Sequence, residues 1–239
     1  MATEDKYVVI GLGRFGTEVA LWLAKHHFPV LAVDTRRQLV DQISAEVDQA
    51  LALDSTNETA LLDARIHEMT VAVCAIGDNH IEDSIMTTAL LHQVGVPRII
   101  SRASTELHAR ILRVVGATEV VNPEKEMGVR TAQRIAHPVI SELIPLAEGA
   151  AVAELVVPES FIGYSLAELR LRSRYGVNLI GIRRFAKQDE EHGAESDESS
   201  ALQPHQFILN PSPTQPFERG DILVLVGSED NVKRLASLG

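Results

Sequence analysis

A glycine-rich turn close to the N-terminus has the residue spacing best suited to chemistry. The run Gly11-Leu12-Gly13-Arg14-Phe15-Gly16 follows directly after the apolar run Tyr7-Val8-Val9-Ile10. In such a G-x-G-x-x-G sequence the first glycine permits a tight turn, the second lets the backbone approach a phosphate, and the third lets a helix pack closely on the strand. The free amides at the start of that helix attract an anion. The turn therefore predicts a site for nucleotide phosphates, with an ordinary tight turn as the alternative.

Asp34 ends the next apolar run, residues 30–33, and is the expected partner of this turn. A carboxylate at that position can accept hydrogen bonds from both hydroxyls of an adenosine ribose. It would also repel a 2′-phosphate, which favours NAD over NADP, although Arg36 and Arg37 nearby leave NADP open.

The loops after the third and fourth expected strands supply further candidates. Asp54-Ser55 ends the third strand, and Ile76-Gly77-Asp78-Asn79 follows the fourth. Ligands of open α/β sheets bind at the carboxyl ends of the strands. Both loops are therefore candidates for an adenine or ribose pocket, and ordinary turn chemistry is the alternative for each.

Two charged residues complete the candidate site. Glu124 follows the last expected strand at the same edge of the sheet, where a carboxylate beside phosphates needs a bridging cation. We treat Glu124 as a conditional metal ligand, or else as an acid stabilised by a helix N-terminus. Arg14, inside the glycine turn, could reach a phosphate of its own ligand or of a neighbouring subunit, or could be solvated.

A sheet is needed to bring these residues together, and apolar runs do alternate with helical segments up to residue 121. Continuous apolar strands are expected where helices cover both faces of a sheet. We predict an α/β fold, in which residues 1–122 form a doubly wound, parallel, Rossmann-like sheet. The expected strands are residues 7–10, 30–33, 49–53, 71–75, 98–101 and 119–121.

The pattern changes after Pro123. We expect residues 123–148 to form connecting or crossover helices, with a kink or boundary at His137-Pro138, because proline disfavours helical geometry at the preceding residue. We expect residues 149–239 to form a smaller α+β module. Its expected strands are residues 151–157, 177–183 and 221–226, and its expected helices are residues 165–170 and 228–238.

An acidic insertion, residues 187–204, lies inside this module. Residues 188–200 carry six acidic side chains and no Lys or Arg. Such a tract cannot bury enough surface to order itself. We expect a mobile loop, and a regulatory role is the alternative.

The composition excludes several classes of function. The 239 residues include 22 Lys and Arg against 33 Asp and Glu, and the resulting net charge of −11 is a poor match for nucleic acid or an anionic membrane. Cys74 is the single cysteine, so no internal disulfide can form. Since no apolar run is long enough for a membrane helix and no signal peptide is evident, we expect a globular, cytosolic protein.

Catalytic motifs are not recognisable in the sequence. It has no phosphate-binding loop of the triphosphatase type, its nine histidines form no metal motif, and no acid–base pair stands out. We therefore expect a binding protein rather than an enzyme, and a small NAD-dependent oxidoreductase is the alternative.

The glycine turn with its Arg-Phe filling resembles the opening of RCK domains, the regulators of conductance of potassium. It is most similar to the cytosolic regulatory subunits of Ktr and Trk potassium uptake systems. The similarity spans the chain apart from the acidic insertion. The segments that carry it are Asp34, Asp54-Ser55, Arg102-Ala103, Gly116-Ala117, Val121-Asn122-Pro123-Glu124, residues 163–166, Glu218-Arg219-Gly220-Asp221 and residues 223–227.

This resemblance implies a nucleotide-gated regulatory subunit that binds ATP, ADP or NAD(H). It implies a homodimer, with helices crossed after Glu124, that assembles into an octameric ring under a membrane potassium-translocating subunit at the inner face of the membrane. Arg14 would reach a phosphate across a subunit interface, and Glu124 would lie near Mg²⁺ or Ca²⁺. A regulator of another cation carrier is the alternative. The implied nucleotide-binding residues are Gly11, Leu12, Gly13, Arg14, Phe15, Gly16, Asp34, Thr35, Asp54, Ser55, Ile76, Gly77, Arg102 and Glu124.

The C-terminal module also resembles a receptor for cyclic di-AMP. In that resemblance Arg172 would face a phosphate and Asn178 a base edge, while Leu171, Leu179 and Pro211 would pack on the ligand. A basic helix end beside an edge strand is the alternative.

Overall fold

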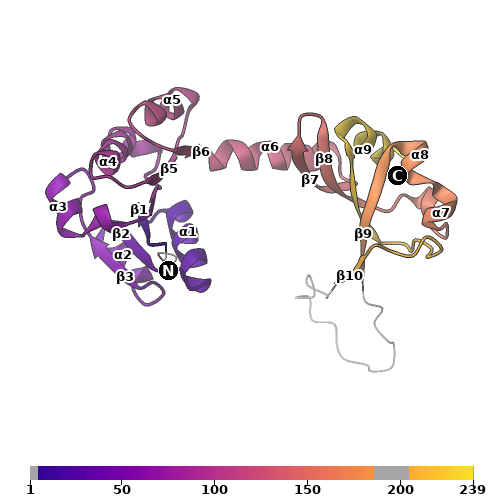
Figure 1. Ribbon diagram of the computed structural model, residues 1–239, viewed down its shortest axis with the longest axis horizontal. Coiled ribbons are helices and arrows are strands. Elements are labelled where there is room, and N and C mark those ends of the chain that lie inside the picture. The colour runs from indigo at the N-terminus through magenta and orange to yellow at the C-terminus, as the bar shows by residue number, and fades with distance from the viewer. Residues whose placement is uncertain (1–4, 186–204, 239) are drawn as a thin grey trace. The chain divides into compact units, whose positions relative to one another are not determined.

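The computed structural model describes residues 5–185 and 205–238. The chain divides into two compact units, Met1–Gly128 and Val129–Gly239 (Figure 1). The acidic insertion expected at 187–204 lies outside the described residues. The domain boundaries expected after residues 122 and 148 stay predictions, and each unit is described by itself below.

The first unit is built on a six-stranded parallel sheet of strand order β3-β2-β1-β4-β5-β6. This order reverses between β1 and β4, as in other doubly wound folds, and it confirms the predicted fold class. The strands are β1 (Tyr7–Ile10), β2 (Val30–Asp34), β3 (Gln49–Ala52), β4 (Val71–Cys74), β5 (Arg98–Arg102) and β6 (Glu119–Val121).

Helices follow the strands along the chain (Figure 1). They are α1 (Arg14–Lys25), α2 (Arg37–Ile43), α3 (Glu58–Asp63), α4 (Ile81–Gln93), α5 (Glu106–Val114) and α6 (Pro123–Ala136), with short 3₁₀ turns η1 (Ile66–Glu68) and η2 (Asp78–His80).

The central strands β1, β2 and β4 are almost entirely apolar because both faces of the sheet are covered there. All five residues of β2 are buried. One hydrophobic cluster joins alternate residues of β1, β2 and β4 to Ala20 of α1 and Val40 of α2. A second cluster joins the intervening strand residues to Leu61 of α3 and Leu91 of α4. The two-sided burial explains why these strands show no polar alternation.

The second unit contains a five-stranded antiparallel sheet of order β10-β9-β11-β8-β7. Its core includes Phe161, Phe217 and Leu223. The strands are β7 (Ile140–Ala147), β8 (Ala150–Val156), β9 (Val177–Phe185), β10 (His205–Leu209) and β11 (Ile222–Ser228), and the helices are η3 (Glu159–Phe161), α7 (Leu166–Leu169), α8 (Leu171–Tyr175) and α9 (Glu229–Ala236).

Two predicted helix starts in this unit are correct in detail. Ser165 and Glu168 form a capping box at α7, with the Ser165 amide donating to Glu168 Oε2 at 2.8 Å. Ser228 caps α9 by accepting a hydrogen bond from the Asn231 amide.

The expectation of helices throughout residues 123–148 is wrong for its second half. Helix α6 ends at Ala136, and Ile140–Ala147 forms strand β7, which pairs with β8. Two prolines, at 138 and 145, oppose helix continuation. Gly149, at a φ of +74°, then provides the turn of a β7–β8 hairpin.

Candidate functional site

A cavity of about 510 Å³ lies at the carboxyl edge of the parallel sheet. The loops that follow β1, β2, β3 and β4 line it, together with the end of β5. The lining residues are Ile10, Gly11, Gly13, Asp34, Thr35, Arg36, Leu53, Asp54, Ser55, Thr56, Ala75, Ile76, Gly77, Asn79, His80, Asp83 and Arg102.

The three glycines of the turn have three different environments. Gly11 has a φ of +96°, which disfavours any other residue. A Cβ on Gly16 would lie 1.9 Å from the Gly11 carbonyl oxygen, so only glycine allows α1 to approach the strand end this closely. A Cβ on Gly13 would meet nothing within 4 Å, which leaves the backbone at the start of α1 open to the cavity.

Asp34 is buried, with 6% of its surface exposed, and it organises the glycine turn. The Leu12 amide donates a hydrogen bond to Asp34 Oδ2 at 2.7 Å, and the Arg36 amide donates to Oδ1 at 2.8 Å. Burial by itself would raise the pKa of Asp34, but the hydrogen bonds from Arg36 and Leu12 outweigh burial and hold this pKa below its ordinary value. Asp34 is therefore ionised at neutral pH.

The Arg36 guanidinium lies over the same carboxylate. Its Nε donates to Asp34 Oδ1 at 3.1 Å and its terminal nitrogen donates to Oδ2 at 3.2 Å. The Arg36 side chain is itself exposed. A ribose that reaches Asp34 must share this carboxylate with Arg36 or displace the guanidinium.

The loop after β3 is held by hydrogen bonds among its own residues and by a contact with helix α4. Asp54 Oδ1 accepts hydrogen bonds from the Thr56 hydroxyl at 2.7 Å and the Thr56 amide at 2.9 Å, and these bonds lower the pKa of Asp54. The Ser55 hydroxyl points away from solvent and lies 2.8 Å from the hydroxyl of Thr87 in α4.

Arg102 connects the cavity to Glu124. Its guanidinium lies 2.6 Å from Glu124 Oε1. Glu124 is exposed at the start of α6 and does not line the cavity. Within residues 5–185 and 205–238, no three His, Cys, Asp or Glu side chains form a group that could hold a metal ion. A role for Glu124 as a cation ligand stays a prediction.

The cavity brings together most, but not all, of the nucleotide-binding residues predicted from the sequence. Leu12 and Gly16 are buried beside the turn, Phe15 packs in the core, and Arg14 is exposed. Thr56, His80 and Asp83 line the cavity without having been predicted as binding residues. Asn79 was expected only as part of the loop after the fourth strand, and Arg36 was considered only for NADP. All five belong to segments that follow strand ends, which is the signal that could have found them.

The second unit holds a cavity of about 670 Å³ at the residues suggested for cyclic di-AMP. Leu171, Arg172, Asn178 and Leu179 line it. Pro211, the fifth suggested residue, is buried and does not line it.

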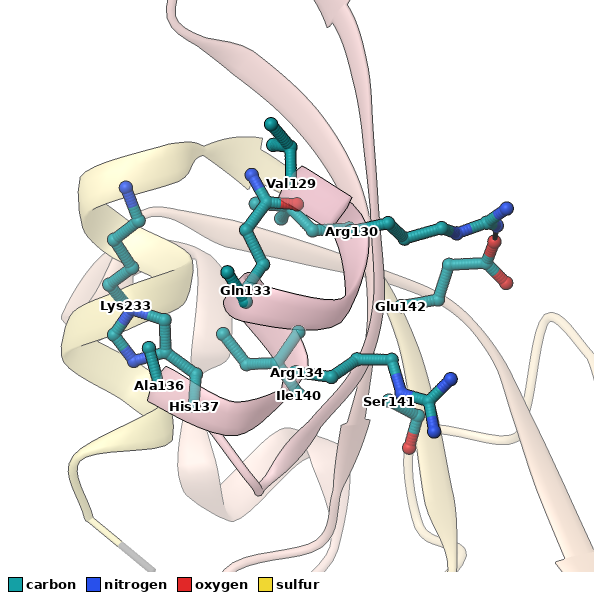
Figure 2. A pocket seen from close by; sticks show the side chains of 12 residues that line it. Val129, Arg130, Gln133, Arg134, Ala136, His137, Ile140, Ser141, Glu142 and Lys233 are labelled. Carbon is teal, nitrogen blue, oxygen red and sulfur yellow. Dashed lines mark ion pairs between the residues drawn. The ribbon is translucent and has the colours of Figure 1, made fainter. Parts of the chain in front are cut away.

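A groove of about 330 Å³ in the second unit was not expected from the sequence. It lies between the end of α6, strand β7 and helix α9 (Figure 2). Val129, Ile140 and Leu143 contribute apolar surface, and Figure 2 shows Arg130 reaching toward Glu142, with which it forms an ion pair. No helix in the described part of the chain is both long and apolar enough to cross a membrane.

Taken together, the doubly wound sheet, the glycine turn and the acidic residue at the end of β2 define a Rossmann-like ligand-binding domain. Residues 7–123 match the family model described as the TrkA-N domain. The Ktr system potassium uptake protein C of Bacillus subtilis (strain 168) is 30% identical over 231 residues, which are 97% of this chain and 96% of that protein. The Ktr system potassium uptake protein A of Vibrio alginolyticus is 31% identical over 240 residues and is covered completely, as is this chain. The chain therefore belongs to the family of RCK regulatory subunits of Ktr potassium uptake systems.

Solved structures agree with this fold. The crystal structure of the GsuK RCK domain is similar with a TM-score of 0.51 and 22% identity, covering 100% of this chain and 47% of that chain. The TrkA-N domain of the inner membrane protein ybaL from Escherichia coli has a TM-score of 0.50 and 19% identity, covering 56% of this chain and 98% of that chain. At these identities the similarity shows the fold alone.

Proposed function

We propose that this chain is a non-enzymatic regulatory subunit of a potassium uptake system and that ATP, ADP or NAD(H) binds in the cavity of the first unit. The observation that supports this most is the convergence of the open Gly13 backbone, the ionised Asp34 and Arg102 on one cavity at the switch point of the sheet. Gly11 and Gly13 would receive phosphates, with Gly16 allowing the close approach of α1. Asp34 with Thr35 would receive the ribose, and the Asp54-Ser55 and Ile76-Gly77 loops would receive the adenine.

Regulation requires that the ligand binds one conformation of the assembly better than another. ATP carries one phosphate more than ADP. Arg14 is exposed at the first turn of α1 and does not line the cavity of its own chain. This position suits a contact with a phosphate bound by a neighbouring subunit, and such a contact would separate ATP from ADP.

Isothermal titration of the purified chain with ATP, ADP and NADH tests the proposal. The wild-type protein should bind adenine nucleotides, and Arg14→Ala should narrow the difference between the ATP and ADP affinities more than it weakens ADP binding. Equal losses of affinity for ATP and ADP would refute the proposal that Arg14 contacts the additional phosphate of ATP. Incubation with NADH and a panel of carbonyl substrates should show no change in absorbance at 340 nm, and turnover would point to an oxidoreductase instead.

We further propose that the working form is a homodimer that assembles into an octameric ring on a membrane potassium-translocating subunit, at the inner face of the membrane. Helix α6 supports the dimer, because none of its 14 residues is buried in the single chain. The groove beside α6 offers apolar surface for a second copy. Pull-down from native membranes with ATP or ADP should recover a potassium channel-like subunit, and recovery of a different cation carrier would redirect the proposal.

A divalent cation, Mg²⁺ or Ca²⁺, is proposed at the nucleotide with Glu124 as a ligand. Glu124 is exposed and forms an ion pair with Arg102, so a bound phosphate could attract Arg102 and free the carboxylate for a cation. Titration of the ATP complex with Mg²⁺, compared between wild type and Glu124→Gln, tests this role.

Cyclic di-AMP is proposed as a second ligand, in the cavity of the second unit. Arg172 and Asn178 are both exposed there and offer a cation and an amide to a phosphate and a base. Titration with cyclic di-AMP should show binding that Arg172→Ala weakens at least tenfold, and unchanged binding would exclude this site.

A further inference from the structure

Helix α4 packs on the sheet with an unusual set of side chains. Its buried residues are Ser84, Thr87, Thr88 and Leu91, so three of the four are hydroxyl residues. Aliphatic side chains would bury more apolar surface at these positions, and a buried hydroxyl is costly unless it is hydrogen-bonded. These hydroxyls therefore contribute hydrogen bonds to neighbouring segments, which hydrophobic side chains could not supply.

The hydroxyls of Thr87 and Thr88 contact different serine hydroxyls. The Thr87 hydroxyl lies 2.8 Å from the Ser55 hydroxyl. The Thr88 hydroxyl donates to the Ser84 carbonyl at 2.8 Å and lies 2.9 Å from the Ser101 hydroxyl. Thr87 and Thr88 are both fully buried, and neither lines the cavity.

The two neighbours differ in how firmly the backbone holds them. Ser101 lies within β5 and is paired with Cys74 of β4 on one side and Val120 of β6 on the other. Ser55 lies beyond the end of β3, in the loop that lines the cavity. The loop's other bonds are mainly local, from Thr56 to Asp54 and from the Asn57 amide to the Asp54 carbonyl.

We propose that Thr87 is a positioning residue for nucleotide binding: through the Ser55 hydroxyl it fixes the Asp54-Ser55-Thr56 segment in the conformation that receives the nucleoside. This inference rests on the proposed nucleotide site. Thr87 itself does not touch the ligand. Its effect comes from holding the loop before the ligand arrives, so that binding does not have to order it.

The test is a double-mutant cycle measured as ADP affinity by isothermal titration. Thr87→Val keeps the shape of the side chain and removes its hydroxyl, and we expect ADP binding to weaken about fivefold to tenfold. Ser55→Ala should weaken binding by a similar factor. The double variant should bind like either single variant, because both substitutions break the same link. If the loss of ADP affinity in the double variant equals the product of the losses in the two single variants, Thr87 does not act through Ser55 and the proposal is overturned.

Thr88→Val is the matched control, since it makes the same change at the next position of the same helix. It should lower the melting temperature about as much as Thr87→Val does but change ADP affinity less than twofold, because Ser101 is already held by two neighbouring strands. Thr87→Ser, which retains the hydroxyl, should restore the affinity. Equal affinity losses for Thr87→Val and Thr88→Val would mean a general packing effect and would overturn the proposal.

The outcomes separate this inference from the proposed function. If the wild-type chain binds no adenine nucleotide, the proposed function fails and the inference fails with it. If the wild type binds ADP and Ser55→Ala binds it equally well, only the positioning role fails. The Ser55→Ala measurement decides the matter even if Thr87→Val does not fold.

Discussion

At the scale of single residues, the Asp34 side chain both anchors the glycine turn and is the proposed contact for a ribose. The Asp34 carboxylate accepts hydrogen bonds from the Leu12 amide of the glycine turn and from the Arg36 amide of the loop after β2. Asp34 is also the residue that we propose to bind a ribose. The glycine turn and the acidic residue are usually described as separate parts of a nucleotide site. In this chain a hydrogen bond of 2.7 Å joins them.

Asp34→Ala should weaken ATP, ADP and NADH binding by similar factors, on the order of tenfold or more, because the three ligands share the adenosine ribose and the glycine turn loses its anchor. Isothermal titration measures the three affinities. Asp41→Ala serves as the control, because Asp41 is an exposed partner of Arg37 on α2 and its removal should leave binding unchanged. Full ADP affinity in Asp34→Ala would contradict the proposed ribose contact.

The stability contribution of Asp34 should depend on pH. Its pKa in the folded protein lies below the ordinary value of 3.8. A depressed carboxyl pKa stabilises the fold above the unfolded-state pKa, and this contribution disappears as the pH falls through the folded-state pKa. Urea unfolding should give a constant difference between wild type and Asp34→Asn above about pH 5, and the difference should shrink below pH 3.8. A difference that does not change with pH would show that the charge of Asp34 contributes nothing.

At the scale of elements, the close approach of α1 to β1 depends on the absence of a Cβ atom at Gly16. A Cβ at Gly16 would lie 1.9 Å from the Gly11 carbonyl oxygen, whereas a Cβ at Gly13 would be in open space. The two glycines share a motif, but Gly16 serves packing, whereas we propose that Gly13 serves ligand access.

Gly16→Ala should destabilise the first unit by about 1–3 kcal/mol, because α1 must move away from the strand. Gly13→Ala should change stability by less than about 0.5 kcal/mol, since its φ of −71° suits alanine, yet it should weaken nucleotide binding strongly. Thermal unfolding and titration of both variants test this division. Loss of stability in Gly13→Ala with normal binding would reverse the assignment.

The sequence predicted the parallel sheet well, because strands covered on both faces are continuous apolar runs, as in Val30–Asp34. It failed at β7, because His137-Pro138 was interpreted as a kink or boundary within connecting helices and Pro145 obscured the strand pattern, and at β10, whose exposed Phe207 and Leu209 give no burial pattern. In the site, the loops at strand ends were predictable from topology. The Arg36 guanidinium and the Thr87 hydroxyl were not, because their roles depend on side-chain directions and on contacts between distant segments.

At the scale of the whole molecule, the similarity to both Ktr relatives extends over both units, because it spans 97% and 100% of this chain. Helix α6 begins in the first unit and ends in the second. Met127 and Ile135 are apolar side chains of this helix, and both are exposed. A long helix with exposed apolar side chains calls for a partner surface.

Ile135→Asp should shift the chain toward monomers in sedimentation velocity experiments, because 74% of the Ile135 surface is exposed in the single chain and a charge there would have to be buried in a dimer. Ile135→Leu keeps the apolar surface and should assemble like the wild type. Nucleotide affinity for ADP should survive Ile135→Asp, because the cavity is built within the first unit. An unchanged oligomer in Ile135→Asp would remove α6 from the proposed interface.

The hydrogen bonds at Asp34 also bear on cation binding. Potassium ions are bound by oxygen atoms, and a bare buried carboxylate would attract them. Both oxygens of Asp34 are instead occupied by N–H donors from Leu12 and Arg36, one of them a guanidinium that already supplies the balancing charge. A cation that reached Asp34 would therefore have to displace an N–H donor from the carboxylate before it could bind there.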